Sequence, residues 1–239
     1  MYFDLPSTLR YMESVAALSS AAERAGIDLF VIPDFVSILP CKDKLSGTNI
    51  WLGAQDCYSE DKGAYTGEVS PMTLKQAGVK IVEIGHAERR RLFGETDQDV
   101  AKKAAAIVEN GMVPLICIGE KSQSQIASQA VGIAVRECQP QIKAALSQIP
   151  DDADVIFGYE PVWAIGASEP AGADHVVTVV QNLRNLVSNR KGSARFLYGG
   201  SAGPGIWKAL SQGVDGLFLG RFVHDPKNLE KVIQDMSEP

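Results

Sequence analysis

The sequence has few of the residues that mark secreted, membrane or metal-binding proteins. Its four cysteines form no C-x-x-C pair, and no two of its three histidines have the spacing of metal ligands on one helix. No apolar run approaches the roughly 18 residues of a membrane span, and the N-terminus lacks the basic and apolar segments of a signal peptide. We therefore expect free thiols, a cytoplasmic location, no metal site and no membrane contact.

The charge balance also excludes a class of partner. The chain carries 23 Lys and Arg against 29 Asp and Glu, a net charge of −6, and has no block of basic residues. This argues against a nucleic-acid partner, and an anionic substrate would need a local positive site. The 239 residues, 45% of them hydrophobic, show no linker or composition shift, so we expect a single domain over residues 1–239.

Short apolar segments alternate with helical segments along the whole chain. Strands are expected at residues 27–32, 50–55, 79–84, 113–118, 154–158, 194–198 and 216–219. Helices are expected at residues 7–25, 36–44, from 70, at 97–110, 123–148 and 173–188, after 205, and at 229–236. Such alternation demands a parallel sheet with crossover helices. An open doubly wound sheet and a closed (β/α)8 barrel both fit, but seven strands preceded by a lone helix resemble a barrel that lacks one strand.

Glu160 stands where a catalytic base is expected. It follows an apolar, β-branched run, and Pro161 then prevents further strand pairing because it has no N–H. An acid at the carboxyl end of a parallel strand suits a base beneath a lid, here residues 161–170. A carboxylate that caps a helix or pairs with an arginine is the other interpretation.

His86 also follows a predicted strand, and Glu88 and three arginines come after it. If a helix begins here, its N-terminus disfavours a positively charged imidazole. A neutral imidazole donates one N–H and can polarise a carbonyl group. A structural histidine bonded to the backbone is the alternative.

Five motifs resemble the triosephosphate isomerase family in order and spacing across nearly the whole chain. They are GAYTGE at residues 63–68, GHAERR at 85–90, CIGE at 117–120, YEPVWAIG at 159–166 and YGGS at 198–201. The resemblance implies a (β/α)8 TIM barrel and a cofactor-free isomerisation between dihydroxyacetone phosphate and glyceraldehyde 3-phosphate through an enediol(ate). It implies that Glu160 is the base and that His86 is the electrophile that shuttles protons between the substrate oxygens. Glu88 resembles the supporting second acid of the family, which positions a substrate-binding lysine.

The resemblance also implies a phosphate site and a partner. Glycine-rich loops let backbone N–H groups converge on an anion, and the expected phosphate-binding residues are Gly166, Gly199, Gly200, Ser201 and Gly220. Residues 63–68 resemble the loop that reaches into a neighbouring subunit. We therefore expect a homodimer, with Thr66 near the partner's site and Tyr65 as an apolar anchor.

The chain departs from the family at several positions. No Asn-x-Lys strand precedes Met1, which removes a substrate-binding lysine and one barrel strand; an incomplete N-terminus and a true start here are both open. Arg221 follows Gly220 where the family usually carries a second glycine, and it either contacts the substrate or points outward. Relatives that isomerise four-carbon erythrulose phosphates resemble this pattern, so that substrate is an alternative, as is a catalytically impaired binding or structural protein.

Overall fold

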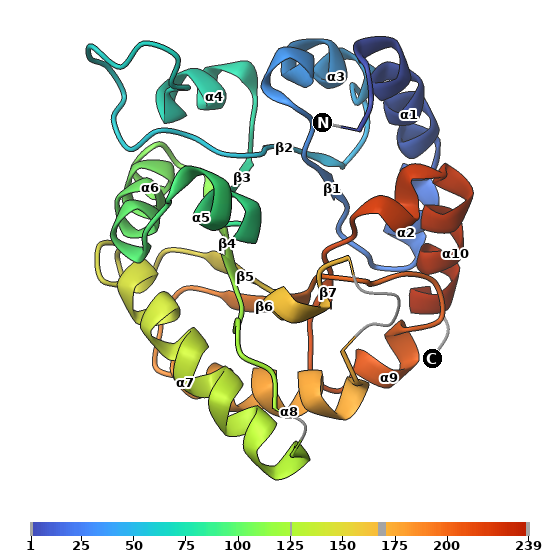
Figure 1. The fold of residues 1–239 in the computed structure, drawn as a ribbon. Coiled ribbons are helices and arrows are strands. Elements are labelled where there is room, and N and C mark those ends of the chain that lie inside the picture. Colours follow the sequence, from blue (N-terminus) through green and yellow to red (C-terminus); the bar gives the residue numbers. More distant parts are fainter. Residues whose placement is uncertain (1, 125, 167–170, 238–239) are drawn as a thin grey trace.

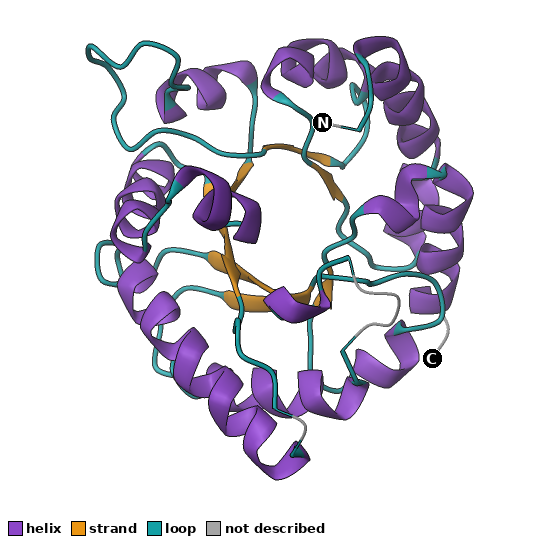
Figure 2. Ribbon diagram, in the orientation of Figure 1, coloured by secondary structure: helices purple, strands orange, loops and turns teal. Residues whose placement is uncertain are grey.

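Seven parallel strands form one curved sheet in the computed structural model, which describes residues 2–124, 126–166 and 171–237. The strands follow one another in chain order, each hydrogen-bonded to the next. They are β1 (Phe30–Val31), β2 (Trp51–Ala54), β3 (Ile81–Ile84), β4 (Val113–Ile118), β5 (Val155–Tyr159), β6 (Ala194–Tyr198) and β7 (Gly216–Leu217). The sheet curls around a central space, which is the architecture of a TIM barrel (Figure 2).

Helices surround the sheet on its outer face (Figure 1). The α-helices are α1 (Leu5–Ala17), α2 (Ser19–Arg24), α3 (Ile38–Lys44), α4 (Pro71–Ala77), α5 (Ala87–Phe93), α6 (Asp97–Glu109), α7 (Ala127–Leu146), α8 (Ala173–Arg184), α9 (Trp207–Leu210) and α10 (Pro226–Ser237). Within the described part of the chain, the short 3-10 helices are η1 (Phe35–Ser37), η2 (Val162–Ala164) and η3 (Arg221–His224). The last two follow β5 and β7 and lie near the candidate site.

The helix boundaries follow from local capping chemistry. Thr96 accepts a hydrogen bond from the Asp99 N–H, and the Asp99 carboxylate accepts one from the Thr96 N–H, so α6 begins with a full capping box. Gly111, just past the end of α6, has a φ of 66°, which glycine adopts without strain. The predicted start of this helix at Asp97 is confirmed.

The prediction of one helix over residues 7–25 is wrong. The structure has two helices, because the end of α1 tightens: the Leu18 N–H donates to the Val15 carbonyl, three residues back, at 3.0 Å. Both segments still bury apolar side chains, Val15 in α1 and Ala22 in α2. The helical pattern was correct, but it did not reveal the interruption.

The alternation of side chains along the strands separates two apolar layers. Val82 and Ile84 of β3 pack outward against the helices in the larger core. Ile81 of the same strand faces a smaller cluster with Leu115 and Leu197 inside the barrel. The inner cluster packs inside the barrel and supports the strands whose ends carry the site.

The barrel is open between β1 and β7. Within the described residues, β1 pairs only with β2, and β7 pairs only with β6. These two strands are two residues long, shorter than the segments 27–32 and 216–219 that the sequence predicted, because each has hydrogen-bonding partners on one side only. The helical layer spans the opening, since α10 packs against α1 (Figure 1). The expected barrel without a first strand is confirmed.

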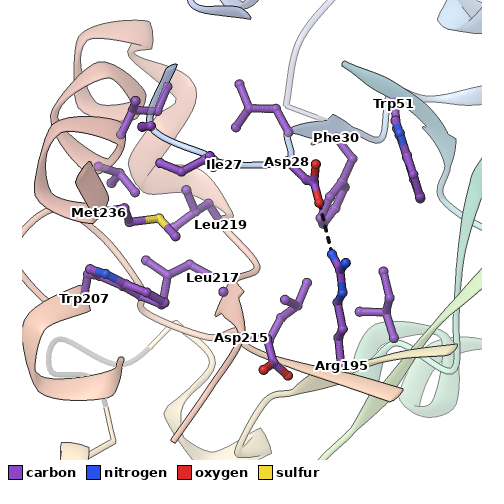
Figure 3. A pocket seen from close by; sticks show the side chains of 18 of the residues that line it. Ile27, Asp28, Phe30, Trp51, Arg195, Trp207, Asp215, Leu217, Leu219 and Met236 are labelled. Atoms are coloured by element: carbon purple, nitrogen blue, oxygen red, sulfur yellow. Dashed lines mark hydrogen bonds and ion pairs between the residues drawn. The ribbon is translucent and has the colours of Figure 1, made fainter. Parts of the chain in front are cut away.

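A cavity of about 500 Å³ lies in this opening. Apolar side chains from both edges line it, among them Phe30, Trp51 and Leu217, and the ion pair between Asp28 and Arg195 crosses it at 3.1 Å (Figure 3). Several of its lining residues precede or begin a strand, among them Val113, Val155 and Asp215, so the cavity extends toward the amino ends of the strands. The candidate site is at the carboxyl ends.

Two expectations from composition can be compared with the fold. All four cysteines are free thiols in buried positions, as expected. Among the described residues, none of the helices is long and apolar enough to cross a membrane.

Candidate active site

Glu160 is a buried carboxylate directly after β5. Its N–H donates to the Ile118 carbonyl at 2.8 Å, so pairing with the neighbouring chain continues one residue beyond the strand. The residue is 7% exposed. Burial raises the pKa of Glu160, and the opposing effects of His86, the Cys117 thiol and the Gly200 backbone N–H only partly offset this. A raised pKa makes the ionised form a stronger base.

His86 faces this carboxylate across a short gap. Its Nε2 lies 3.6 Å from Oε2 of Glu160, and its Nδ1 accepts the Glu88 N–H at 3.3 Å at the start of α5. Because Nδ1 is an acceptor, the proton of a neutral imidazole is on Nε2, the atom that points toward Glu160. Within the described residues, Oε2 of Glu160 has no hydrogen-bond partner. The pair therefore offers a free carboxylate oxygen and an N–H donor side by side.

Close backbone packing fixes Glu160 from two sides. A Cβ on Gly199 would lie 2.5 Å from Oε1 of Glu160, and a Cβ on Gly119 would overlap the Glu160 carbonyl oxygen. Only glycine fits at either position, which explains the glycine in both the 117–120 and the 198–201 motifs. Both glycines directly follow the ends of neighbouring strands of β5.

A second buried acid, Glu83, lies beneath the pair inside the barrel. Its Oε1 is 3.7 Å from the Cys117 Sγ, and the Cys117 thiol also interacts with Glu160. Burial, and then the charge of Glu160, raises the pKa of Glu83 well above its usual range. Two such carboxyl groups in an apolar interior do not both ionise readily, so each raises the pKa of the other.

The predicted phosphate-binding residues lie on three loops at the carboxyl ends of the strands. Ser201 donates from Oγ to the Ala164 carbonyl at 3.3 Å, which joins the loop after β6 to η2. Gly200 has a φ of 97°, and Gly220 is followed at once by η3. These contacts place the loop after β6 against the segment that follows Glu160.

Arg221, the first residue of η3, reaches toward the loop after Glu160. Its Nη2 lies 3.3 Å from where a Cβ on Gly166 would be, and both residues are exposed. The structure therefore brings the two residues together from segments 55 positions apart. The remainder of the predicted lid, residues 167–170, lies outside the described residues.

The two supporting residues are placed differently. Glu88 is mostly exposed, with Oε2 3.9 Å from Nδ1 of His86, so it is beside the pair. Thr66 is exposed in the loop between β2 and α4, and no contact among the described residues joins it to Glu160 or His86. Tyr65 packs against Tyr58 with the rings tilted by 44° and their centroids 4.5 Å apart, and it keeps 42% of its surface exposed.

Sequence reasoning missed a network beside the base. Glu120 accepts hydrogen bonds from the Trp163 indole N–H at 2.9 Å and from the Tyr159 hydroxyl at 3.1 Å. Tyr198, at the end of β6, accepts the Ala171 N–H on its hydroxyl at 3.1 Å. The position of Glu120 just after a strand could have indicated a role, but its partners are too far along the chain for spacing to reveal them.

Space for a small ligand exists beside Glu160. A cavity of about 780 Å³ is lined by Glu160, Glu88 and Ile165. The lining carries charges of both signs: Arg90, Arg91 and Lys121 lie there together with five acidic residues, so the described lining as a whole has no excess of positive charge.

The fold and site define a class of protein: a parallel β/α barrel with a buried carboxylate and a histidine N–H at the carboxyl ends of its strands. The sequence also matches the family model described as triosephosphate isomerase over residues 1–236. The chain belongs to the triosephosphate isomerase family.

Its relatives carry two different names. It is 39% identical over 243 residues to L-erythrulose-1-phosphate isomerase of Pectobacterium atrosepticum, which covers 98% of this chain and 92% of that protein. It is 39% identical over 210 residues to L-erythrulose-1-phosphate isomerase of Brucella abortus biovar 1, with 85% and 80% covered. It is 37% identical over 213 residues to triosephosphate isomerase of Aquifex aeolicus, with 86% and 85% covered.

Proposed function

We propose that the chain is an aldose–ketose isomerase that interconverts dihydroxyacetone phosphate and glyceraldehyde 3-phosphate through an enediol(ate), without a cofactor. The observation that carries this proposal is the facing pair itself. A buried carboxylate of raised pKa lies 3.6 Å from an imidazole nitrogen that holds a proton. A carboxylate base beside a neutral histidine is the established pairing of the triosephosphate isomerase family.

The reaction follows from the two groups in four proton movements. Glu160 removes a proton from the carbon beside the carbonyl group, while the Nε2–H of His86 donates to the carbonyl oxygen. The electron pair of the broken C–H bond forms the carbon–carbon double bond of the enediol. His86 then recovers a proton from the neighbouring hydroxyl, and Glu160 returns its proton to the adjacent carbon. No atom or electron is left over, so the chemistry needs no cofactor.

The glycine-rich loops supply a site for the substrate phosphate. Backbone N–H groups of Gly199 to Ser201 and of Gly220 bind an anion without side-chain interference in this proposal. Arg221 adds a guanidinium, a group that binds phosphate oxygens in pairs. Its place at the mouth of the site is supported by its nearness to Gly166, on which an added Cβ would lie 3.3 Å from the Arg221 Nη2.

A four-carbon sugar phosphate is the second candidate substrate. It is favoured by relatives named L-erythrulose-1-phosphate isomerase at 39% identity, against 37% for a relative named triosephosphate isomerase. Arg221 is the residue whose guanidinium either holds the phosphate of both sugars or contacts the extra hydroxyl group of the longer one. Arg221→Gly should raise KM about ten-fold for any sugar phosphate that it touches. An unchanged KM for both sugars would show that Arg221 does not contact the substrate.

We also infer a homodimer. Tyr65 and Thr66 protrude from the long loop after β2, and Leu92 and Phe93 at the end of α5 are exposed apolar side chains. Such side chains suit an interface because their burial removes apolar surface from water. Light scattering at micromolar concentration should give twice the chain mass, and Tyr65→Lys should lower it; a monomer at all concentrations contradicts the inference.

A coupled assay tests the proposed function. Glyceraldehyde 3-phosphate and an erythrulose phosphate should be compared on this chain, and on a version extended by an N-terminal strand that ends in Asn-x-Lys. The better substrate identifies the enzyme. A phosphorylated transition-state analogue must also bind far more tightly than inorganic phosphate. If the analogue and inorganic phosphate bind equally well and neither sugar is turned over, the chain is better explained as a binding or structural protein.

A further inference from the structure

A buried carboxylate outside the reacting pair is bound by several side chains. Glu120, in the loop after β4, is 1% exposed. Its Oε1 accepts the indole N–H of Trp163 at 2.9 Å, and its Oε2 accepts the hydroxyl of Tyr159 at 3.1 Å. Both donors are neutral, so hydrogen bonds alone do not neutralise a carboxylate at this depth.

Among the described residues, His175 is the basic side chain that reaches this carboxylate. It lies in the first turn of α8, and its Nε2 is 3.4 Å from Oε1 of Glu120 and 3.2 Å from the Tyr159 hydroxyl. Its ring meets the Trp163 indole edge-on, with centroids 6.1 Å apart. Among the described residues, His175 forms the only ion pair with Glu120 within 4.0 Å. Because an uncompensated buried carboxylate is strongly unfavourable, this contact matters for the whole cluster.

The two side chains that donate hydrogen bonds to Glu120 lie on either side of Glu160 in the sequence. Tyr159 precedes the base directly, and Trp163 follows it by three positions. The backbone is tied to the same loop, since the Val162 N–H donates to the Glu120 carbonyl at 2.9 Å. A change in the Glu120 side chain is therefore transmitted to the segment that carries the base.

We propose that His175 is a positioning residue for Glu160, acting through Glu120 on Tyr159 and Trp163. The role concerns catalysis by the pair proposed above and so rests on that function. His175 contacts neither Glu160 nor His86 among the interactions of the described residues. Its effect should appear in the rate of the chemical step rather than in substrate affinity.

Kinetics of three variants test this role. His175→Leu removes the ring nitrogen that contacts Tyr159 and Glu120, whereas His175→Gln retains an N–H donor of similar reach. Thr178→Val changes an exposed residue one turn further along α8 and is the matched control. We expect His175→Leu to lower kcat about ten-fold with KM within two-fold, because a small displacement of a reacting group is costly. His175→Gln should recover most of the loss, and the control should match the parent.

Fluorescence tests the positioning without requiring turnover. The chain has three tryptophans, so Trp51→Phe and Trp207→Phe leave Trp163 as the single indole. Without ligand, His175→Leu should shift the Trp163 emission to longer wavelength, since Trp163 and His175 line the same solvent-open cavity of about 370 Å³. The emission shift can be measured even if the parent turns over no sugar phosphate. Failure of the positioning role can therefore be told apart from failure of the proposed isomerase function. Unchanged emission, or a kcat for His175→Leu within two-fold of the parent, would overturn the proposal.

Discussion

Gly199→Ala should impair the base while leaving its chemistry intact. The new Cβ would lie 2.5 Å from Oε1 of Glu160 and even nearer to its Cγ. An ordinary contact between such atoms is about 3.5 Å, so the carboxylate must move by about 1 Å. A displacement of this size lowers the rate about 100-fold.

The same substitution should also lower stability. Inserting an extra methyl group into a packed site destabilises a protein by about 1–3 kcal/mol. For a chain of this length, that corresponds to a fall in Tm of roughly 2–4 °C per kcal/mol. Gly199 does not have a positive φ, so the effect comes from the clash rather than from backbone strain.

Gly132→Ala is the matched control. Gly132 lies inside α7, and a Cβ there would have no neighbour within 4 Å. Alanine has the higher helix propensity, so this variant should be about 0.5–1 kcal/mol more stable with unchanged kcat. Steady-state kinetics and thermal unfolding of both variants provide the measurement. A Gly199→Ala enzyme within two-fold of the parent kcat would refute the close-packing argument.

Three further predictions follow from buried charges. Because burial raises the pKa of Glu160, kcat/KM should fall as pH drops through a value above the usual range for glutamate, and a pH profile that stays flat down to pH 4.5 would contradict this. Folding raises the pKa of Glu83, so the ionisation of Glu83 lowers the stability of the folded state as the pH rises above 4.5. Glu83→Gln should therefore raise Tm at neutral pH but not at pH 4, which calorimetry would show. Lys103 binds both Asp56 and Glu95 in the interior, so Lys103→Met should destabilise the protein by about 3–5 kcal/mol, and a loss below 1 kcal/mol on urea unfolding would count against it.

Much of the site was predictable because its residues directly follow strands. The carboxyl ends of parallel strands meet at one end of a barrel, so Glu160 after β5 and His86 beside β3 had to come together. The start of α6 at Asp97 was equally predictable, because the capping residue Thr96 and its partner Asp99 are only three positions apart. Local chemistry and strand direction account for these successes.

Other features depend on contacts that the sequence does not encode locally. Glu120 and His175 are 55 positions apart in the sequence, and so are Gly166 and Arg221. No periodicity of the sequence connects the members of either pair. In the sequence Glu83 is an acid within an apolar strand, and only the folded structure shows that its carboxyl group is buried near Glu160. The short β1 and β7 also reflect missing pairing partners rather than their own residues.

The central claim is that Glu160 moves a proton between two carbons of a phosphorylated sugar. It is tested most directly by carrying out the reaction in deuterated water with the parent chain and with Glu160→Gln, for both candidate sugars. The account predicts deuterium on the carbon beside the carbonyl group with the parent, and a rate lower by about 10² to 10⁴ with the variant. Product without solvent deuterium, or an equal rate for Glu160→Gln, would contradict the role of Glu160.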